Sequence, residues 1–261
     1  MSNALSRMPA EMTAIEISHP GGPQVLIPVR RPVPRPDADE VLIRVSAAGV
    51  NGADVLQRKG QYHPPSCASD IPGLEVSGEV IEVGAAVHVF KPGDLVCALL
   101  TGGGYAEYAI ANEAVTMRLP AGLNLVEAAA MPETFLTVWL NLMQRGKLQA
   151  GNSVLIHGGT SGIGTTATMI AKAMGASNIM TTVSSEANRD ASMRLGANHA
   201  INYREEDFVA KVEEFIGGIG ADLILDIIGG DYVARNFAAA AMNGRIVQIS
   251  ALEGPAKELN L

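Results

Sequence analysis

The residues best suited to bind a charged ligand form a glycine-rich segment, Gly-Gly-Thr-Ser-Gly-Ile-Gly, at positions 158–164. Small residues there would let backbone N–H groups approach a pyrophosphate at a helix N-terminus, where the helix dipole favours anions. The spacing Gly-x-x-Ser-x-x-Gly differs from the strict G-x-G-x-x-G pattern, so a glycine turn of any α/β protein remains the alternative for this stretch alone. The predicted phosphate-binding residues are Gly158, Ser161, Gly162, Ile163 and Gly164.

The elements around this segment favour the dinucleotide interpretation. Three strand-type residues, Val154–Ile156, precede it, and apolar residues at steps of four, three and four follow it, which indicates a helix that ends near Gly175. The region between 124 and 150 contains two expected helices, 125–131 and 132–144, and lies between two parts of the chain that differ in their sequence pattern. Beyond it, strands and helices alternate, which predicts a Rossmann-type, doubly wound parallel sheet of α/β class. The expected strands are 154–156, 178–183, 199–203, 221–228 and 245–250, and the expected helices are 162–174, 186–195, 205–216 and 231–242.

The part before residue 124 has a different pattern. Val41, Ile43 and Val45 alternate with Leu42, Arg44 and Ser46, which is the period of a half-buried strand. Further strand patterns at 74–83, 93–100 and 105–110 are separated by glycine and proline turns. This texture predicts a small, irregular β-rich unit.

The end of the second expected strand bears on which dinucleotide binds. An NAD-binding fold usually carries an acidic residue about 20 residues after the glycine turn, where it holds the ribose 2′-hydroxyl. Here the strand ends in Thr182-Val183-Ser184-Ser185. A serine leaves room for a 2′-phosphate and favours NADPH over NADH, although Glu186 is close enough to weaken this inference.

Composition excludes several classes of protein. The 261 residues are 48% hydrophobic but only 4% aromatic, as expected for buried parallel strands packed closely against helices. A formal charge of −8 argues against a nucleic-acid partner, since like charges repel, and no apolar run reaches the length of a membrane span. Two cysteines, Cys67 and Cys97, form no motif, so a reducing cytoplasm is the expected compartment.

The chain resembles the zeta-crystallin-like quinone oxidoreductase branch of the medium-chain dehydrogenase/reductase superfamily. The segments that match are 48–54, 72–78, 104–108 and 158–164, and the segments 54–65 and 157–164 are similar to the p53-inducible quinone oxidoreductase-like subgroup. The resemblance implies a GroES-like catalytic domain over 13–132, a Rossmann dinucleotide-binding domain over 133–261, NADPH in a cleft between them, and a homodimer. Family members continue beyond the position of Leu261, so we expect the recorded chain to be incomplete.

Zinc-dependent relatives of this family hold their catalytic metal with a cysteine near positions 49–54 and with a His-Glu pair. This sequence has no cysteine there and has Leu74-Glu75 at the pair. A structural zinc site needs four clustered ligands, typically cysteines, which are absent from the sequence, and the histidines show no ligand spacing. We therefore expect a zinc-independent enzyme. The histidines are His19, His63, His88, His157 and His199.

Without a metal, hydride transfer suits an acceptor that is already electrophilic, such as a quinone or a conjugated enone. By resemblance, Asn51 and Tyr62 line the substrate side near the nicotinamide, and Asn51 is a candidate cofactor-binding residue as well as a catalytic one. An amide and a phenol can each hydrogen-bond an oxygen that gains negative charge. Asn51 as a turn residue and Tyr62 as a packing aromatic are the structural alternatives. Thr137 resembles the threonine that faces the nicotinamide, and its alternative is a hydroxyl bonded to its own helix.

The resemblance also implies contacts at the two ends of the cofactor. Ser184, Ser185 and Tyr203 match positions around the 2′-phosphate, and Arg189 could supply a positive charge where the family commonly has a lysine at the neighbouring Asn188. Ile228-Gly229-Gly230 resembles the loop at the nicotinamide ribose, with a plain βα turn as its alternative. Ser250, at the end of the next strand, is a further candidate.

The sequence thus predicts an NADPH-dependent quinone oxidoreductase. A 2-enoyl or enone reductase is the alternative within the same superfamily, and a nucleotide-binding protein without catalysis is the alternative from another class.

Overall fold

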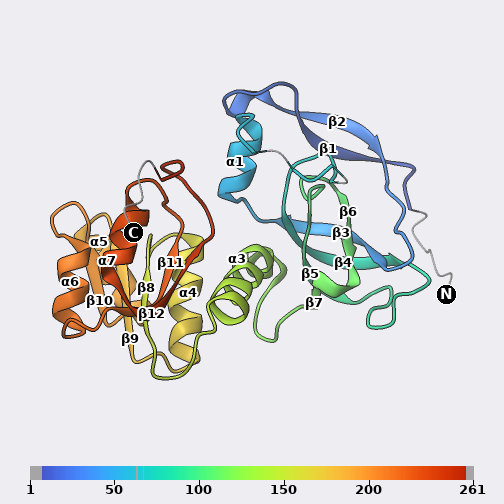
Figure 1. Ribbon diagram of the computed structural model, residues 1–261. Coiled ribbons are helices and arrows are strands. Elements are labelled where there is room, and N and C mark those ends of the chain that lie inside the picture. The colour runs from blue at the N-terminus through green and yellow to red at the C-terminus, as the bar shows by residue number, and fades with distance from the viewer. Residues whose placement is uncertain (1–7, 63, 67, 257–261) are drawn as a thin grey trace. The chain divides into compact units, whose positions relative to one another are not determined.

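The computed structural model describes residues 8–62, 64–66 and 68–256 of the chain, so His63 and Cys67 lie outside the described residues. The chain divides into two compact units, one through Glu133 and one from Thr134 onward (Figure 1). Within the described residues, no helix is long and apolar enough to cross a membrane.

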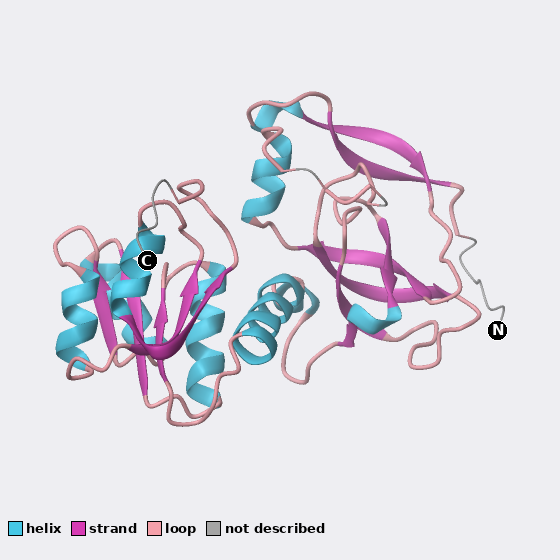
Figure 2. Ribbon diagram, in the orientation of Figure 1, coloured by secondary structure: helices cyan, strands magenta, loops and turns pink. Residues whose placement is uncertain are grey.

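The first unit is built from antiparallel strands (Figure 2). Strands β1 (Glu11–Ile17) and β2 (Leu26–Pro32) form a hairpin around the short 3₁₀ helix η1 (Pro23–Val25). A five-stranded sheet has the order β6-β3-β4-β5-β7. Its strands are β3 (Glu40–Ala48), β4 (Glu75–Val83), β5 (Leu95–Leu99), β6 (Tyr108–Asn112) and β7 (Thr116–Arg118), with the 3₁₀ helix η2 (Glu113–Val115) between the last two.

Two short helices complete this unit. Helix α1 (Gly52–Arg58) begins directly after Asn51, whose backbone N–H donates to the Asp54 carboxylate at 2.8 Å. Helix α2 (Leu125–Ala128) begins in the same way, because Asn124 and Glu127 exchange side-chain-to-backbone hydrogen bonds of 2.9 Å. Each cap satisfies N–H groups that the first turn of a helix leaves without an acceptor.

The second unit is a parallel sheet with strand order β10-β9-β8-β11-β12. Its strands are β8 (Ser153–Ile156), β9 (Asn178–Val183), β10 (His199–Asn202), β11 (Ala221–Asp226) and β12 (Ala240–Gln248). Its helices are α3 (Pro132–Val138, which starts at the unit boundary), the π-helix η3 (Trp139–Arg145), α4 (Gly162–Ala173), α5 (Glu186–Leu195), α6 (Phe208–Phe215) and α7 (Tyr232–Ala239).

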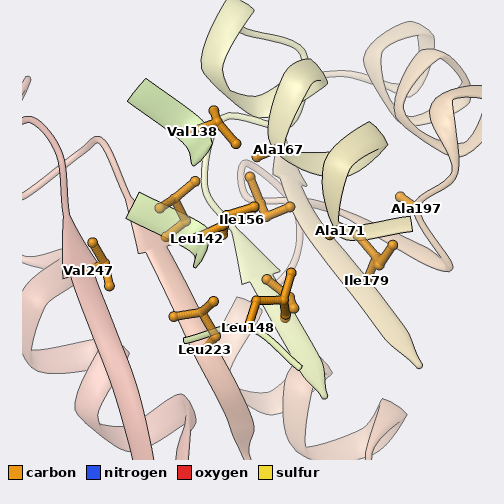
Figure 3. Close-up of a cluster of buried hydrophobic side chains, with 12 residues drawn as sticks. Val138, Leu142, Leu148, Ile156, Ala167, Ala171, Ile179, Ala197, Leu223 and Val247 are labelled. Atoms are coloured by element: carbon orange, nitrogen blue, oxygen red, sulfur yellow. The ribbon is translucent and has the colours of Figure 1, made fainter. Parts of the chain in front are cut away.

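Hydrophobic side chains of this sheet pack into two separate cores. Val154 and Ile156 of β8 point into one cluster with Ala167 and Ala171 of α4, as Figure 3 shows for Ile156, Ala167 and Ala171. Leu155, between them, belongs to a second cluster that includes Phe208 and Val212 of α6 and Ala239 of α7. Because successive residues of a strand face opposite sides of the sheet, this alternation requires helices on both faces. The prediction of a Rossmann-type parallel sheet that follows a β-rich unit is confirmed.

Several predicted boundaries were wrong, and two of the helix boundaries have a local reason. The helix expected from 125 to 131 ends at Ala128, since Met131 precedes Pro132 and the residue before proline is disfavoured in a helix. The helix expected from 205 begins at Phe208, because the Asp207 side chain caps it by accepting from Val209 N.

Tertiary pairing overrides helix propensity at the last strand. The helix expected to reach 242 ends at Ala239, and β12 starts at Ala240, which pairs with Ala221 of β11. The expected strands 221–228 and 245–250 end earlier, at Asp226 and Gln248. The single helix expected over 132–144 is divided into α3 and η3, and the strand expected from 105 begins at Tyr108.

Candidate functional site

A cavity of about 360 Å³ opens at the carboxyl ends of β8, β9, β10 and β11 in the second unit. This is the edge of a parallel sheet at which doubly wound folds bind their ligands. The residues that line it are Gly158, Thr160, Ser161, Thr182, Val183, Ser184, Tyr203, Ile227, Ile228, Tyr232, Leu252 and Glu253.

The glycine turn after β8 forms one wall of this cavity and requires its glycines. Gly158 has a φ of +71°, in the left-handed region, and a side chain on it would meet Ile227 Cδ1 at 2.8 Å. A Cβ on Gly164 would lie 2.8 Å from the Gly158 carbonyl carbon and 2.9 Å from Gly159 Cα, and closer still to the Gly158 oxygen. The first turn of α4 therefore packs directly on the backbone of the preceding turn.

Ser161 holds the turn and the helix together. Its hydroxyl donates to the Gly158 carbonyl oxygen at 2.8 Å and accepts from Gly164 N at 3.0 Å, so Ser161 is the N-cap of α4. The predicted residues Gly162 and Ile163 lie in the first turn of this helix, where backbone N–H groups have no intrahelical acceptor. An anion at this point would meet these donors and the positive end of the helix dipole.

A second glycine turn, after β11, forms another part of the same site. The fully buried Asp226 carboxylate accepts from Ile228 N at 2.7 Å and from Gly229 N at 3.1 Å. Gly229 and Gly230 have φ values of +71° and +53°. Our sequence analysis missed Asp226, although an acidic residue at the end of a buried strand, just before Ile-Gly-Gly, was a visible signal.

Three of the predicted 2′-phosphate residues, Ser184, Ser185 and Arg189, make hydrogen bonds or ion pairs with neighbouring side chains or backbone. The Ser184 hydroxyl accepts from Asn188 Nδ2 at 3.0 Å, and the Ser185 hydroxyl caps α5 by accepting from Asn188 N at 3.3 Å. The Arg189 guanidinium pairs with Glu206 at 2.6 Å and with Glu186 at 3.3 Å. Asn188 thus supports Ser184 from the position of the family's lysine, and Arg189 is held by two carboxylates.

Five of the predicted cofactor residues line the cavity, namely Gly158, Ser161, Ser184, Tyr203 and Ile228. The glycines next to them, Gly164, Gly229 and Gly230, shape the two turns. Thr137 lies in α3 of the same unit, half-buried, and its carbonyl accepts from Asn141 Nδ2, while Ser250 follows β12. Sequence analysis missed the lining residues Thr160, Thr182, Val183, Ile227, Tyr232, Leu252 and Glu253, most of which follow strand ends.

In the first unit, Asn51 is held by a buried carboxylate. Its Nδ2 donates to Glu75 Oε1 at 2.9 Å, and the other oxygen of Glu75 accepts from Glu133 N at 2.9 Å. A carboxylate only accepts hydrogen bonds, so Glu75 fixes which end of the Asn51 amide faces it. Burial raises the pKa of the Glu75 carboxyl, against the lowering effect of these two hydrogen bonds.

Asp54 holds the segment that carries Asn51. Besides Asn51 N, its carboxylate accepts from Gly73 N at 3.2 Å and from the Tyr105 hydroxyl at 3.0 Å. Burial and the neighbouring Asp54 raise the pKa of the Tyr105 phenol, which therefore stays a donor. Tyr62 lies after α1 and is half-buried.

The space that a zinc-ligating side chain would need at Gly49 is filled by Glu75. A Cβ on Gly49 would lie 2.5 Å from Glu75 Cδ. Among the described residues, no three histidine, cysteine, aspartate or glutamate side chains are grouped so that they could hold a metal ion.

Each of the two units matches a known protein family. Residues 37–121 match the alcohol dehydrogenase GroES-like domain family, and residues 162–261 match the zinc-binding dehydrogenase family. A quinone oxidoreductase of Lama guanicoe is 33% identical over 246 residues, which are 94% of this chain and 74% of that protein. The chain belongs to the quinone oxidoreductase branch of the medium-chain dehydrogenase/reductase superfamily.

Solved structures with at least 30% sequence identity have the same fold as this chain. A mycobacterial protein complexed with NADPH has a TM-score of 0.84 and 32% identity, and the match covers 95% of this chain and 76% of that chain. The CurK enoyl reductase has a TM-score of 0.83 and 30% identity, with 94% and 75% covered. The family prediction is confirmed, and this family binds nicotinamide cofactors.

Proposed function

We propose that this oxidoreductase is an NADPH-dependent, zinc-independent quinone reductase. The observation that carries the proposal is the cavity at the carboxyl ends of the parallel strands, walled by the two turns at Gly158 and Gly229. The proposal keeps the predicted domains, with a catalytic domain over 13–132 and a dinucleotide-binding domain over 133–261.

The residues of the cavity fit a dinucleotide. The turn at Gly158 and the first turn of α4 offer backbone donors and a helix dipole to a pyrophosphate. At the end of β9, Ser184 takes the place where an NAD-binding fold usually has an acidic residue, which supports NADPH as the preferred form. Tyr203, which is 43% exposed beside it, offers a ring face and a hydroxyl.

Quinone chemistry needs little from the protein beyond positioning. When bound, the nicotinamide supplies the hydride. Addition of that hydride to a quinone leaves an anionic oxygen, and a proton from water completes the reduced product. The Asn51 amide has one N–H engaged with Glu75, and its second N–H is the donor that we assign to the oxygen that gains charge. Tyr62 is the second predicted donor.

Zinc independence is supported by the residues at the family's metal position. Leu74 is apolar, Glu75 is already hydrogen-bonded to Asn51 and to the backbone of Glu133, and the Glu75 side chain occupies the space beside Gly49. We further expect a homodimer located in the cytoplasm, with a small quinone as its partner; light scattering of the purified protein tests the dimer.

An enone reductase is the second candidate, favoured by the similarity to the CurK enoyl reductase. A nucleotide-binding protein without catalysis is the third.

The test is NADPH consumption by the purified protein, with an ortho-quinone and an enone offered in parallel and NADH as the alternative donor. Quinone-dependent turnover that prefers NADPH and survives exhaustive chelation is the expected result. Turnover with the enone alone would replace the proposal by the second candidate. NADPH binding without turnover would favour the third.

A further inference from the structure

A buried chain of hydrogen bonds joins the two glycine turns through His157, a residue that the proposed chemistry does not use. From the first turn, Gly158 N donates to Thr182 Oγ1 at 3.2 Å, and Thr182 Oγ1 lies 3.1 Å from His157 Nδ1. On the other side of the ring, His157 Nε2 lies 2.7 Å from Asn236 Oδ1. Asn236 Nδ2 then donates to Asp226 Oδ2 at 3.0 Å.

This series of hydrogen bonds ends at the second glycine turn, where Asp226 Oδ1 accepts from Ile228 N and Gly229 N. Five residues, from the turn after β8, the ends of β9 and β11, and helix α7, therefore form one continuous network beside the cavity. We call this network the relay; its members are His157, Thr182, Asp226, Asn236 and the Gly158 amide.

One group sets the direction of every proton in the relay. The Asp226 carboxylate can only accept, so the Asn236 amide must turn its NH₂ toward Asp226 and its oxygen toward His157. Because that oxygen accepts, His157 must carry its proton on Nε2. Nδ1 then accepts from the Thr182 hydroxyl, which leaves the oxygen of that hydroxyl free to accept from Gly158 N.

The surroundings keep His157 neutral and its ring fixed. His157, Asn236 and Asp226 are fully buried, and the rings of Phe208 and Tyr232 each meet the imidazole edge to face at 4.9 Å. Burial lowers the pKa of His157, and the Arg235 charge lowers it further, while Asn236 and Asp226 act in the opposite direction. A fully satisfied polar network in such a place is rigid, and it is costly to break.

We propose that His157 is a positioning residue which, as the neutral Nε2–H tautomer, couples the turn at Gly158 to the turn at Gly229 and holds both in the shape that binds the dinucleotide. The proposal rests on the proposed function only for the identity of the ligand. Asp226 acts through the relay as the residue that selects the tautomer.

The substitution Asp226→Asn tests the direction of the relay at nearly constant volume. Its amide oxygen can still accept from Ile228 N and Gly229 N, but its NH₂ then faces the NH₂ of Asn236. Asn236 must turn over, and His157 must move its proton to Nδ1. In ¹⁵N NMR of the imidazole rings, recorded without cofactor, we expect Nε2–H in the natural protein and Nδ1–H in the variant.

Asp222→Asn is the matched control. Asp222 lies on the same strand as Asp226, and its carboxylate likewise accepts from a backbone N–H, that of Ser153, at 2.8 Å. This control has no bond to the relay, so we expect the His157 tautomer and the NADPH affinity to stay as in the natural protein.

The second measurement is NADPH affinity by fluorescence titration. Because the reversed relay leaves the Thr182 proton without an acceptor, we expect Asp226→Asn to raise the Kd roughly tenfold, as for the loss of a buried hydrogen bond. Asn236→Leu and Thr182→Val each break the relay at a different point. If both act through His157, the double variant should weaken binding by clearly less than the product of the two single effects.

An Nδ1–H tautomer in the natural protein would overturn the proposal, and so would an unchanged tautomer or an unchanged NADPH affinity in a folded Asp226→Asn variant. If that variant does not fold, independent effects of Asn236→Leu and Thr182→Val would overturn it as well. Failure of the proposed function is distinguishable, because it would appear as absent quinone turnover in a natural protein that keeps the Nε2–H tautomer.

Discussion

Replacement of Gly164 by alanine tests the packing of α4 on the glycine turn. The new methyl group would lie 2.8 Å from the Gly158 carbonyl carbon, which is 0.6 Å inside the 3.4 Å at which ordinary contact begins, and it would lie closer to the carbonyl oxygen. These are backbone atoms, so the turn or the helix must move. Overpacking of this kind costs about 1–3 kcal/mol, and the better helix propensity of alanine returns up to about 1 kcal/mol.

We therefore expect Gly164→Ala to lower the Tm by several degrees and to lower NADPH-dependent turnover about 100-fold, because a displacement near 1 Å is enough to misalign bound groups. Gly164→Asp should abolish binding, since it adds an anion to the clash. The assays are thermal unfolding, fluorescence titration with NADPH, and steady-state kinetics.

Gly162→Ala is the control for this experiment. It makes the same substitution two positions earlier, where the nearest atom to a new Cβ is the Thr134 methyl group at 3.2 Å. That side chain can yield, so the Tm should stay equal or rise slightly. A Gly164→Ala protein with the Tm and the NADPH affinity of the natural protein would refute the packing argument.

Three other perturbations test separate parts of the structure. In Glu75→Gln a single amide oxygen replaces the two carboxylate oxygens that accept from Asn51 Nδ2 and Glu133 N. The free energy of unfolding measured in urea should therefore fall by about 1–3 kcal/mol. We also expect a lower kcat and an unchanged Kd for NADPH. Because burial lowers the pKa of His157 in the folded protein, its imidazole takes up a proton just below pH 6.5 only in the unfolded chain. The free energy of unfolding should therefore fall with decreasing pH by up to about 1.4 kcal/mol per pH unit. In urea titrations at several pH values, His157→Gln should make this pH dependence shallower. Glu206→Gln removes the 2.6 Å ion pair of Arg189 and leaves the longer pair with Glu186, so it should raise the preference for NADPH over NADH roughly threefold in binding titrations, whereas an unchanged ratio would argue against a role of Arg189 at the phosphate.

Local pattern was sufficient for the architecture. The period of apolar residues in β8 and α4, and Gly175 just past the helix with a φ of +80°, are properties of neighbouring residues, and they predicted the parallel sheet correctly. The same holds for the glycines at 158 and 164, whose tight backbone approach is visible in the motif itself. The roles predicted for Asn51, Tyr62 and the cofactor residues stay predictions.

The local sequence pattern was misleading where a partner distant in the sequence determines the structure. Alanine-rich residues after Ala239 continue a helical pattern, but Ala240 pairs with Ala221 across the sheet and becomes strand. Arg189 looked available to a phosphate, yet Glu206, seventeen positions away, holds it.

The amino-acid sequence by itself determined the fold family, the order of strands and helices, and the position of the glycine turn, because these follow from short-range periodicity and backbone sterics. Only the tertiary structure decided that Glu75 orients Asn51 and that His157 joins Thr182 to Asn236 and Asp226. These contacts link residues 10 to 79 positions apart. Their proton directions depend on buried groups that face one another only after the strands have paired.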